Sequence, residues 1–142
     1  EKFALSILFM ILLLVTLILI YLKYPNTAQG LSERLPFSFY LAWITVATIV
    51  NISYVLKYYG VDLGISEAVG SLVLVAVAVV IGYLALENSK DIYFVLVIVW
   101  ALIGIVVKTS NTTMQNGTLI MTIILIIAAL AQFMINRKTQ RV

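Results

Sequence analysis

The sequence predicts an all-α protein, a polytopic transmembrane helix bundle with about five spans. Hydrophobic residues make up 63% of the 142 residues and charged residues 11%, whereas soluble domains contain roughly 45–50% and about 25%. Mean hydropathy is +1.14, and nine basic plus six acidic side chains are too few to cover a water-facing surface. We therefore expect the lipid bilayer to surround a single transmembrane domain over residues 1–142.

Five apolar stretches have lengths near the roughly 20 residues that cross a hydrocarbon core. They lie at residues 3–22, 37–56, 68–86, 92–107 and 118–135. None of them contains a charged residue, and all fifteen charges fall in the ends and connections. This partition is expected because a charge at mid-bilayer costs about 2.5–3.5 kcal/mol. The fourth stretch is the shortest, so a re-entrant segment is its alternative to a full span.

The connections contain residues that break or begin helices. Pro36 introduces the second stretch, because the residue before proline is pushed away from helical geometry. Residues 111–113 and 116–117 form a polar fourth connection. Glu67 and Asp91 each precede a stretch by one residue, so we expect solvated charges or helix N-caps there.

The basic residues are unequally divided between the two sides of the membrane. Alternate connections lie on opposite sides, which gives three basic residues on the side of Lys2 and six on the side of the C-terminus. The six are Lys23, Arg34, Lys90, Arg137, Lys138 and Arg141. The positive-inside bias therefore predicts an outside N-terminus and a cytoplasmic C-terminus.

Several classes of chemistry lack their usual residues. The chain has no cysteine and no histidine, which removes thiol nucleophiles, Cys/His metal sites and histidine acid–base catalysis. No carboxylate lies within a predicted span, which argues against a proton pump. The basic residues are scattered, so nucleic acid is not an expected partner. We expect no catalytic residues, no metal site and no enzymatic activity.

The second span has a polar stripe. Ser38, Thr45, Thr48 and Asn51 project into a sector roughly 140° wide, and Trp43 faces largely away from it. An unpaired amide in hydrocarbon is costly, so Asn51 should face another helix or a wet cavity. The stripe serves either interhelical hydrogen bonding or a ligand-facing wall.

Two tryptophans and several small residues complete the candidate set. Trp100 falls near the middle of the fourth span, where its N–H would need a partner inside the bundle. The candidate ligand-binding residues are Trp43, Thr45, Thr48, Asn51 and Trp100. Small residues allow close helix approach, and the candidate packing residues are Ser71, Ala78, Gly82, Ala101 and Gly104.

Residues 35–51, with the sequence LPFSFYLAWITVATIVN, closely resemble a stretch of bacterial tryptophan-rich sensory proteins related to the TspO/MBR family. Residues 64–67, 91–93 and 100–105 are similar to the same group. The resemblance implies a bacterial inner-membrane protein with a ligand-binding or sensory role, because family members are five-helix proteins that bind porphyrins, sterols and related hydrophobic ligands. With only two Trp and two Pro, the family's ligand motifs are not visible, and no contact residues are transferred.

The long forms of this group have additional Trp-rich helices upstream, and the chain begins at Glu1 without an initiator Met. We therefore expect the chain to be a C-terminal part of a longer protein, and the alternative is that only a few residues precede Glu1.

The predicted function is binding of a hydrophobic or tetrapyrrole-like ligand, with a porphyrin as the candidate cofactor. A structural subunit or helix-packing partner in a larger membrane complex is the first alternative, and a passive transporter is the second. Candidate partners besides lipid are upstream helices, other membrane subunits and a second copy of the chain.

Overall fold

The computed structural model describes residues 2–23, 31–60, 64 and 66–139. Within these ranges the chain forms five helices: α1 (Lys2–Lys23), α2 (Leu31–Tyr58), α3 (Glu67–Ser89), α4 (Ile92–Lys108) and α5 (Thr112–Thr139). Each of the five predicted stretches lies in a helix of its own. The all-α prediction is confirmed.

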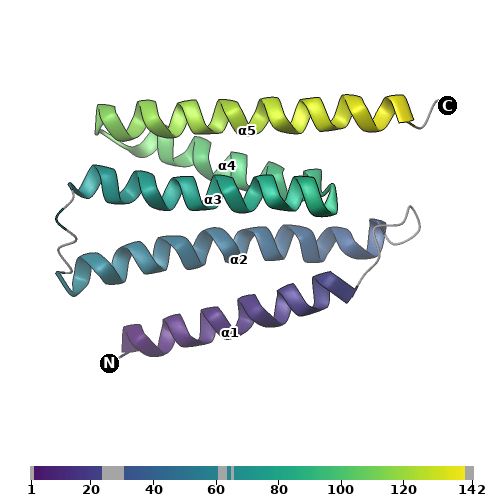
Figure 1. The fold of residues 1–142 in the computed structure, drawn as a ribbon. Helices are drawn as coiled ribbons and strands as arrows, with labels where there is room; N and C mark the ends of the chain where they lie inside the picture. The colour runs from purple at the N-terminus through teal and green to yellow at the C-terminus, as the bar shows by residue number, and fades with distance from the viewer. Residues whose placement is uncertain (1, 24–30, 61–63, 65, 140–142) are drawn as a thin grey trace.

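The helices run side by side along one direction, with the two chain ends at opposite ends of the bundle (Figure 1). Helix α4 contacts α2, α3 and α5, whereas α1 contacts α2 alone among the helices as described. Four helices have the length and composition to cross a membrane, and α4 is a shorter apolar helix of 17 residues. Because α4 is continuous from Ile92 to Lys108, about 25 Å at 1.5 Å per residue, it is not broken into a re-entrant hairpin.

Two helix starts differ from those predicted. Helix α2 begins at Leu31, so Pro36 lies inside it and does not mark its beginning. Proline at the sixth position of the helix removes one intrahelical backbone hydrogen bond, the one that an N–H at this position would donate to a carbonyl of the first turn. Helix α5 begins at Thr112, because the Asn111 side chain accepts a hydrogen bond of 3.0 Å from the Met114 N–H and caps it. The predicted fourth connection is therefore mostly helical.

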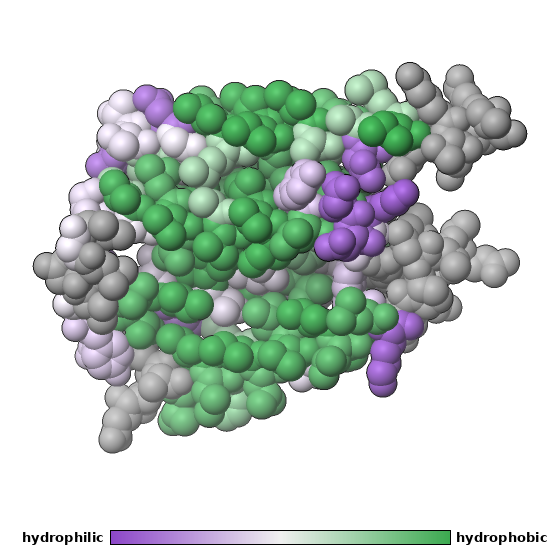
Figure 2. All heavy atoms as spheres, viewed as in Figure 1, coloured by the Kyte–Doolittle hydropathy of each residue, from purple (hydrophilic) through white to green (hydrophobic). Residues whose placement is uncertain are grey.

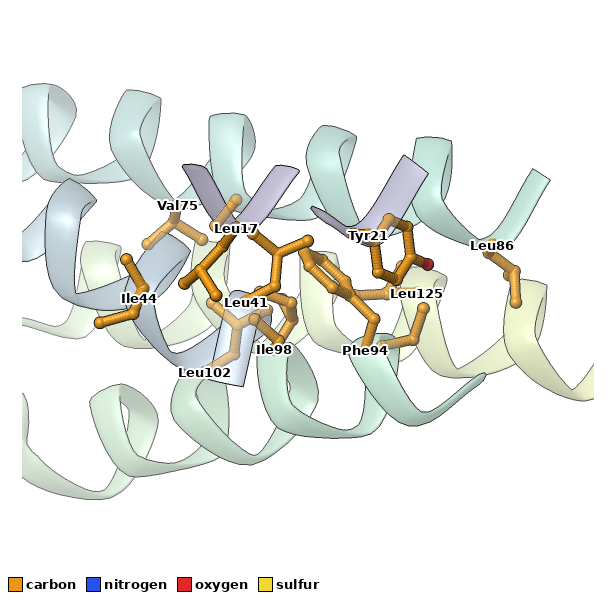
Figure 3. Packing of buried hydrophobic residues seen from close by; sticks show 13 residues of the cluster. Leu17, Tyr21, Leu41, Ile44, Val75, Leu86, Phe94, Ile98, Leu102 and Leu125 are labelled. Carbon is orange, nitrogen blue, oxygen red and sulfur yellow. The ribbon is translucent and has the colours of Figure 1, made fainter. Parts of the chain in front are cut away.

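Side chains from all five helices join one apolar core (Figure 3). Its most deeply buried members include Ala42, Val95, Ile98 and Leu125. Many large apolar side chains remain on the outside, and the face shown in Figure 2 is hydrophobic through its middle, with hydrophilic residues toward its two ends. An apolar exterior of this kind is expected when lipid is the solvent.

Candidate functional site

An aromatic groove lies on the outer surface between α2 and α4. The rings of Trp43 and Trp100 are 5.8 Å apart between centroids and inclined at 41°. Phe39 and Tyr93 form a second tilted pair at 6.0 Å. Such tilted arrangements are the favoured ones for aromatic side chains. The two pairs place four rings along one seam of the bundle, because residues three, four and seven apart share one helix face.

The groove measures about 370 Å³ and has almost wholly apolar walls. Its lining residues are Phe39, Trp43, Leu96, Val97 and Trp100. Trp43 is 49% exposed and Trp100 is 64% exposed. The expectation that Trp100 is buried inside the bundle is therefore wrong. In a membrane, the ring of an outward indole meets lipid without a hydrophobic penalty, so its hydrophobicity does not force it inward.

The threonines of the candidate site face the interior. Thr45 and Thr48 are buried, and their hydroxyls donate to the carbonyls of Leu41 and Ile44 in their own helix, at 2.8 and 2.7 Å. Such back-bonding satisfies a hydroxyl without a partner helix or a ligand. Thr45 follows Trp43 by two residues, about 200° around the helix, which places the two side chains on different faces.

Asn51 faces the neighbouring helix. Its side-chain amide nitrogen donates to Met10 Sδ of α1 at 2.7 Å. The predicted stripe therefore packs within the bundle, and the five candidate ligand-binding residues do not form one pocket. Only Trp43 and Trp100 lie together, outside the bundle.

The predicted packing residues have different surroundings. Ala78 and Gly82 are buried, and a Cβ on Gly82 would lie 3.3 Å from Leu125 Cδ2 of α5. Ser71 and Ala101 are half-buried and line a cavity that is partly open to the outside. Gly104 is exposed, with nothing within 4 Å of its Cβ position. The packing prediction for Gly104 is therefore corrected, because α4 turns this face outward.

Gly117, which the sequence places in the fourth connection, lies in α5 and packs closely against α3. A Cβ at this position would lie 2.6 Å from Leu72 Cδ2 of α3. The absence of a side chain lets α5 approach α3 closely along this turn. A small residue such as Gly117 can indicate close helix packing, but Asn116 before it is typical of a turn, so the sequence favoured a loop here.

A buried polar cluster joins α1, α2 and the start of α4. Asp91 is 6% exposed, and its Oδ2 accepts hydrogen bonds from Tyr21 Oη at 2.6 Å and Ser38 Oγ at 2.5 Å. Its Oδ1 accepts the Phe94 N–H at 3.0 Å, which makes Asp91 the N-cap of α4. A carboxylate at a helix N-terminus is favoured by the helix dipole.

The cap at Asp91 agrees with the sequence prediction, but the solvated environment does not. Burial of a carboxylate is costly unless donors replace its water, and here three donors do so. Alternating topology could have indicated the cluster, because the end of span one, the start of span two and the start of span four share one side of the bilayer. Glu67, by contrast, is exposed, and Ser66 caps α3 by accepting the Val69 N–H at 3.3 Å.

A cavity of about 200 Å³, partly open to the outside, lies between α2, α3, α4 and α5. Its walls are mostly aliphatic, and only the lining residues Ser53, Ser71 and Met114 carry a hydroxyl or a thioether. Pockets for drug-sized ligands usually measure about 300–1,000 Å³. The cavity is smaller than this range, whereas the outer groove falls within it.

Antiparallel apolar helices with a lipid-compatible exterior and charges confined to the ends define a multi-pass membrane protein. A family model described as TSPO-like protein matches residues 1–135. The chain therefore belongs to the TSPO-like protein family, as the resemblance at residues 35–51 predicted. No curated protein and no solved structure matches it.

Proposed function

We propose that this TSPO-like membrane protein binds a flat hydrophobic ligand, tetrapyrrole-like in class, in the outer groove between α2 and α4. The observation that supports the proposal is the Trp43–Trp100 pair, whose rings lie 5.8 Å apart at the edge of a groove of about 370 Å³. Aromatic faces provide a large apolar contact area and favour stacked or tilted rings. A hydrophobic ligand dissolved in the bilayer reaches such a groove without crossing water.

The roles of the individual residues differ from those first expected. Trp43 and Trp100 form the stacking surface, and Phe39 extends it along α2. Thr45 and Thr48 bond to carbonyls of their own helix and Asn51 bonds to Met10 of α1, and none of the three contacts the ligand. The protein binds its ligand without converting it, in keeping with a family that is generally not enzymatic.

The location of the two tryptophans allows a direct test, because they are the only tryptophans in the chain. Titration of the purified protein with a porphyrin should quench tryptophan fluorescence in a saturable way. Trp43→Phe and Trp100→Phe should each weaken binding by about 2- to 10-fold, measured by the porphyrin absorbance band. Tyr83→Phe, an exposed aromatic on α3 away from the groove, is the matched control. Quenching that is absent, or affinity unchanged in both tryptophan variants, would contradict the proposal.

A helix-packing role is the second candidate, and the position of α1 favours it. This helix packs along α2 and meets the start of α4 through Tyr21 and Asp91, and it exposes Leu8, Phe9, Leu12 and Leu19. The free face suits a neighbouring membrane helix as well as lipid. Native electrophoresis after mild detergent extraction distinguishes the two roles: a species of the chain's own mass that still binds porphyrin favours the ligand-binding role.

Transport is not proposed, because the stripe that suggested a polar path faces inward with its threonine donors bonded to backbone.

We also propose a bacterial inner-membrane location with the C-terminus in the cytoplasm. The support is the six-to-three division of basic residues between the two sides. Of these nine residues, Arg141 lies outside the described ranges. In this orientation the Asp91 cluster lies at the cytoplasmic end of the bundle.

A further inference from the structure

We infer that the cavity between α2, α3, α4 and α5 is a second binding site, which takes a small apolar molecule with one hydrogen-bonding group. Its volume is about 200 Å³, and an engineered apolar cavity of about 150 Å³ in another protein holds benzene. The space therefore fits one or two fused rings and is too small for a tetrapyrrole. This inference does not rest on the proposed outer groove, which different residues line.

Two hydroxyl groups give the cavity its chemical selectivity. Ser53 comes from α2 and Ser71 from α3, and both line the cavity. Both are half-buried, and neither side chain makes a hydrogen bond to the residues that the structure describes. Thr45 and Thr48, on the same helix as Ser53, instead bond to backbone carbonyls. Two hydroxyls without protein partners, in otherwise apolar walls, match a guest with a single polar atom.

The remaining walls suit an aromatic or aliphatic guest. Val75, Ala78, Ile98 and Leu102 are buried core residues that line the cavity. Met114 adds a thioether, which makes favourable contacts with aromatic rings. A guest that fills the cavity makes dispersion contacts with these lining atoms.

The cavity lies next to the bilayer. Val50 lines it and is also exposed at the outer surface, and α2 and α3 make the loosest of the helix–helix contacts. A small apolar molecule that partitions into lipid can therefore enter between these two helices. A water-borne route is not required.

The test uses unlabelled indole as the probe, with the full chain in lipid nanodiscs and the labelled methyl groups of methionine and alanine and the labelled rings of tryptophan observed by NMR. Saturable shifts are expected at the methyl groups of Met114 and Ala78, which line the cavity, and not at Met134, which is exposed elsewhere on α5. Ala101→Leu should abolish the saturable shifts by filling the cavity. Ala76→Leu, on α3 and not among the lining residues, should leave them unchanged.

Three results would overturn the inference. The first is shifts that rise linearly with indole and are equal at Met134, which indicate partition into lipid. The second is shifts that survive Ala101→Leu. The third is saturable shifts confined to the ring signals of Trp43 and Trp100, which place indole in the outer groove.

A second pair of variants tests the hydroxyls without filling the cavity. The double variant Ser53→Ala with Ser71→Ala should weaken indole binding about fivefold, the effect of one neutral hydrogen bond. Binding of toluene, which has no polar atom, should be unchanged. Equal affinities of wild type and double variant for indole would contradict the selectivity that we assign to the two serines.

Discussion

Two polar links tie helices together at opposite ends of the bundle, and they differ in burial more than in length. At one end, Tyr21 and Ser38 donate to Asp91 at 2.6 and 2.5 Å, and Asp91 is 6% exposed. At the other end, Lys57 at the end of α2 meets Glu67 at the start of α3 at 2.5 Å, with side chains 71% and 74% exposed. Distance alone does not separate the two links.

The comparison shows that the stabilising effect of a short polar contact depends on what replaces it when it breaks. Water and mobile ions readily solvate an exposed ammonium and carboxylate, so surface ion pairs contribute about 0–1 kcal/mol. A buried carboxylate has no such replacement, and its loss removes the acceptor that Tyr21, Ser38 and the Phe94 N–H share. We therefore expect the Asp91 end to control the stability of the bundle and the Lys57 end to contribute little.

The largest expected effect is a difference in cysteine labelling between the two ends of the bundle, which shows which end faces the cytoplasm. The chain has no native cysteine, so single cysteines can be placed at Ser110, between α4 and α5, and at the exposed Asn88 at the end of α3. A membrane-impermeant maleimide added to spheroplasts should label Ser110→Cys fully and Asn88→Cys only after lysis. The reverse pattern would place the Asp91 cluster outside the cell and contradict the orientation.

The next effect tests the buried link itself. Asp91→Ala should destabilise the bundle by about 3 kcal/mol, because it removes the acceptor for Tyr21, Ser38 and the Phe94 N–H. Unfolding in a detergent–SDS series, followed by circular dichroism, measures the change. Glu87→Ala, an exposed acid at the same end, is the control and should change stability by less than about 0.5 kcal/mol. Equal losses in the two variants would show that burial is not the deciding factor.

A smaller effect is expected when one donor alone is removed. Tyr21→Phe keeps the buried ring and removes the hydroxyl that donates to Asp91, so we expect about 1.5 kcal/mol of destabilisation. In the Asp91→Ala background the same change should cost almost nothing, because its acceptor is already gone. The same unfolding series measures both. Independent, additive losses would mean that the Tyr21 hydroxyl acts through another partner.

The sequence was sufficient for the helices because each span is a long run without charge, and this pattern depends on local composition. The sequence was not sufficient to predict which face of each helix points into the bundle and which faces lipid. Helix α4 is apolar on all sides, and lipid is as apolar as the core, so the pattern does not tell whether Trp100 faces in or out. The same limit explains why Gly104 was assigned to packing.

The candidate site was predicted only in part for a related reason. Trp43 and Trp100 lie together, but their contact with each other on the outside depends on how α2 and α4 are rotated. The hydrogen bond between Tyr21 and Asp91 joins residues 70 positions apart, and no local pattern encodes it. Such contacts come from helix packing, which a single sequence does not specify.

The smallest effect should come from the exposed link. Lys57→Ala should change the free energy of unfolding by less than about 0.5 kcal/mol, because both charged groups are already hydrated when they are paired. Glu67→Ala should behave in the same way, since Ser66 and not Glu67 caps α3. Raised salt should remove whatever difference remains. A loss comparable to that of Tyr21→Phe would instead mean that the ion pair fixes the loosely packed α2–α3 junction, and burial would no longer explain the difference between the two ends.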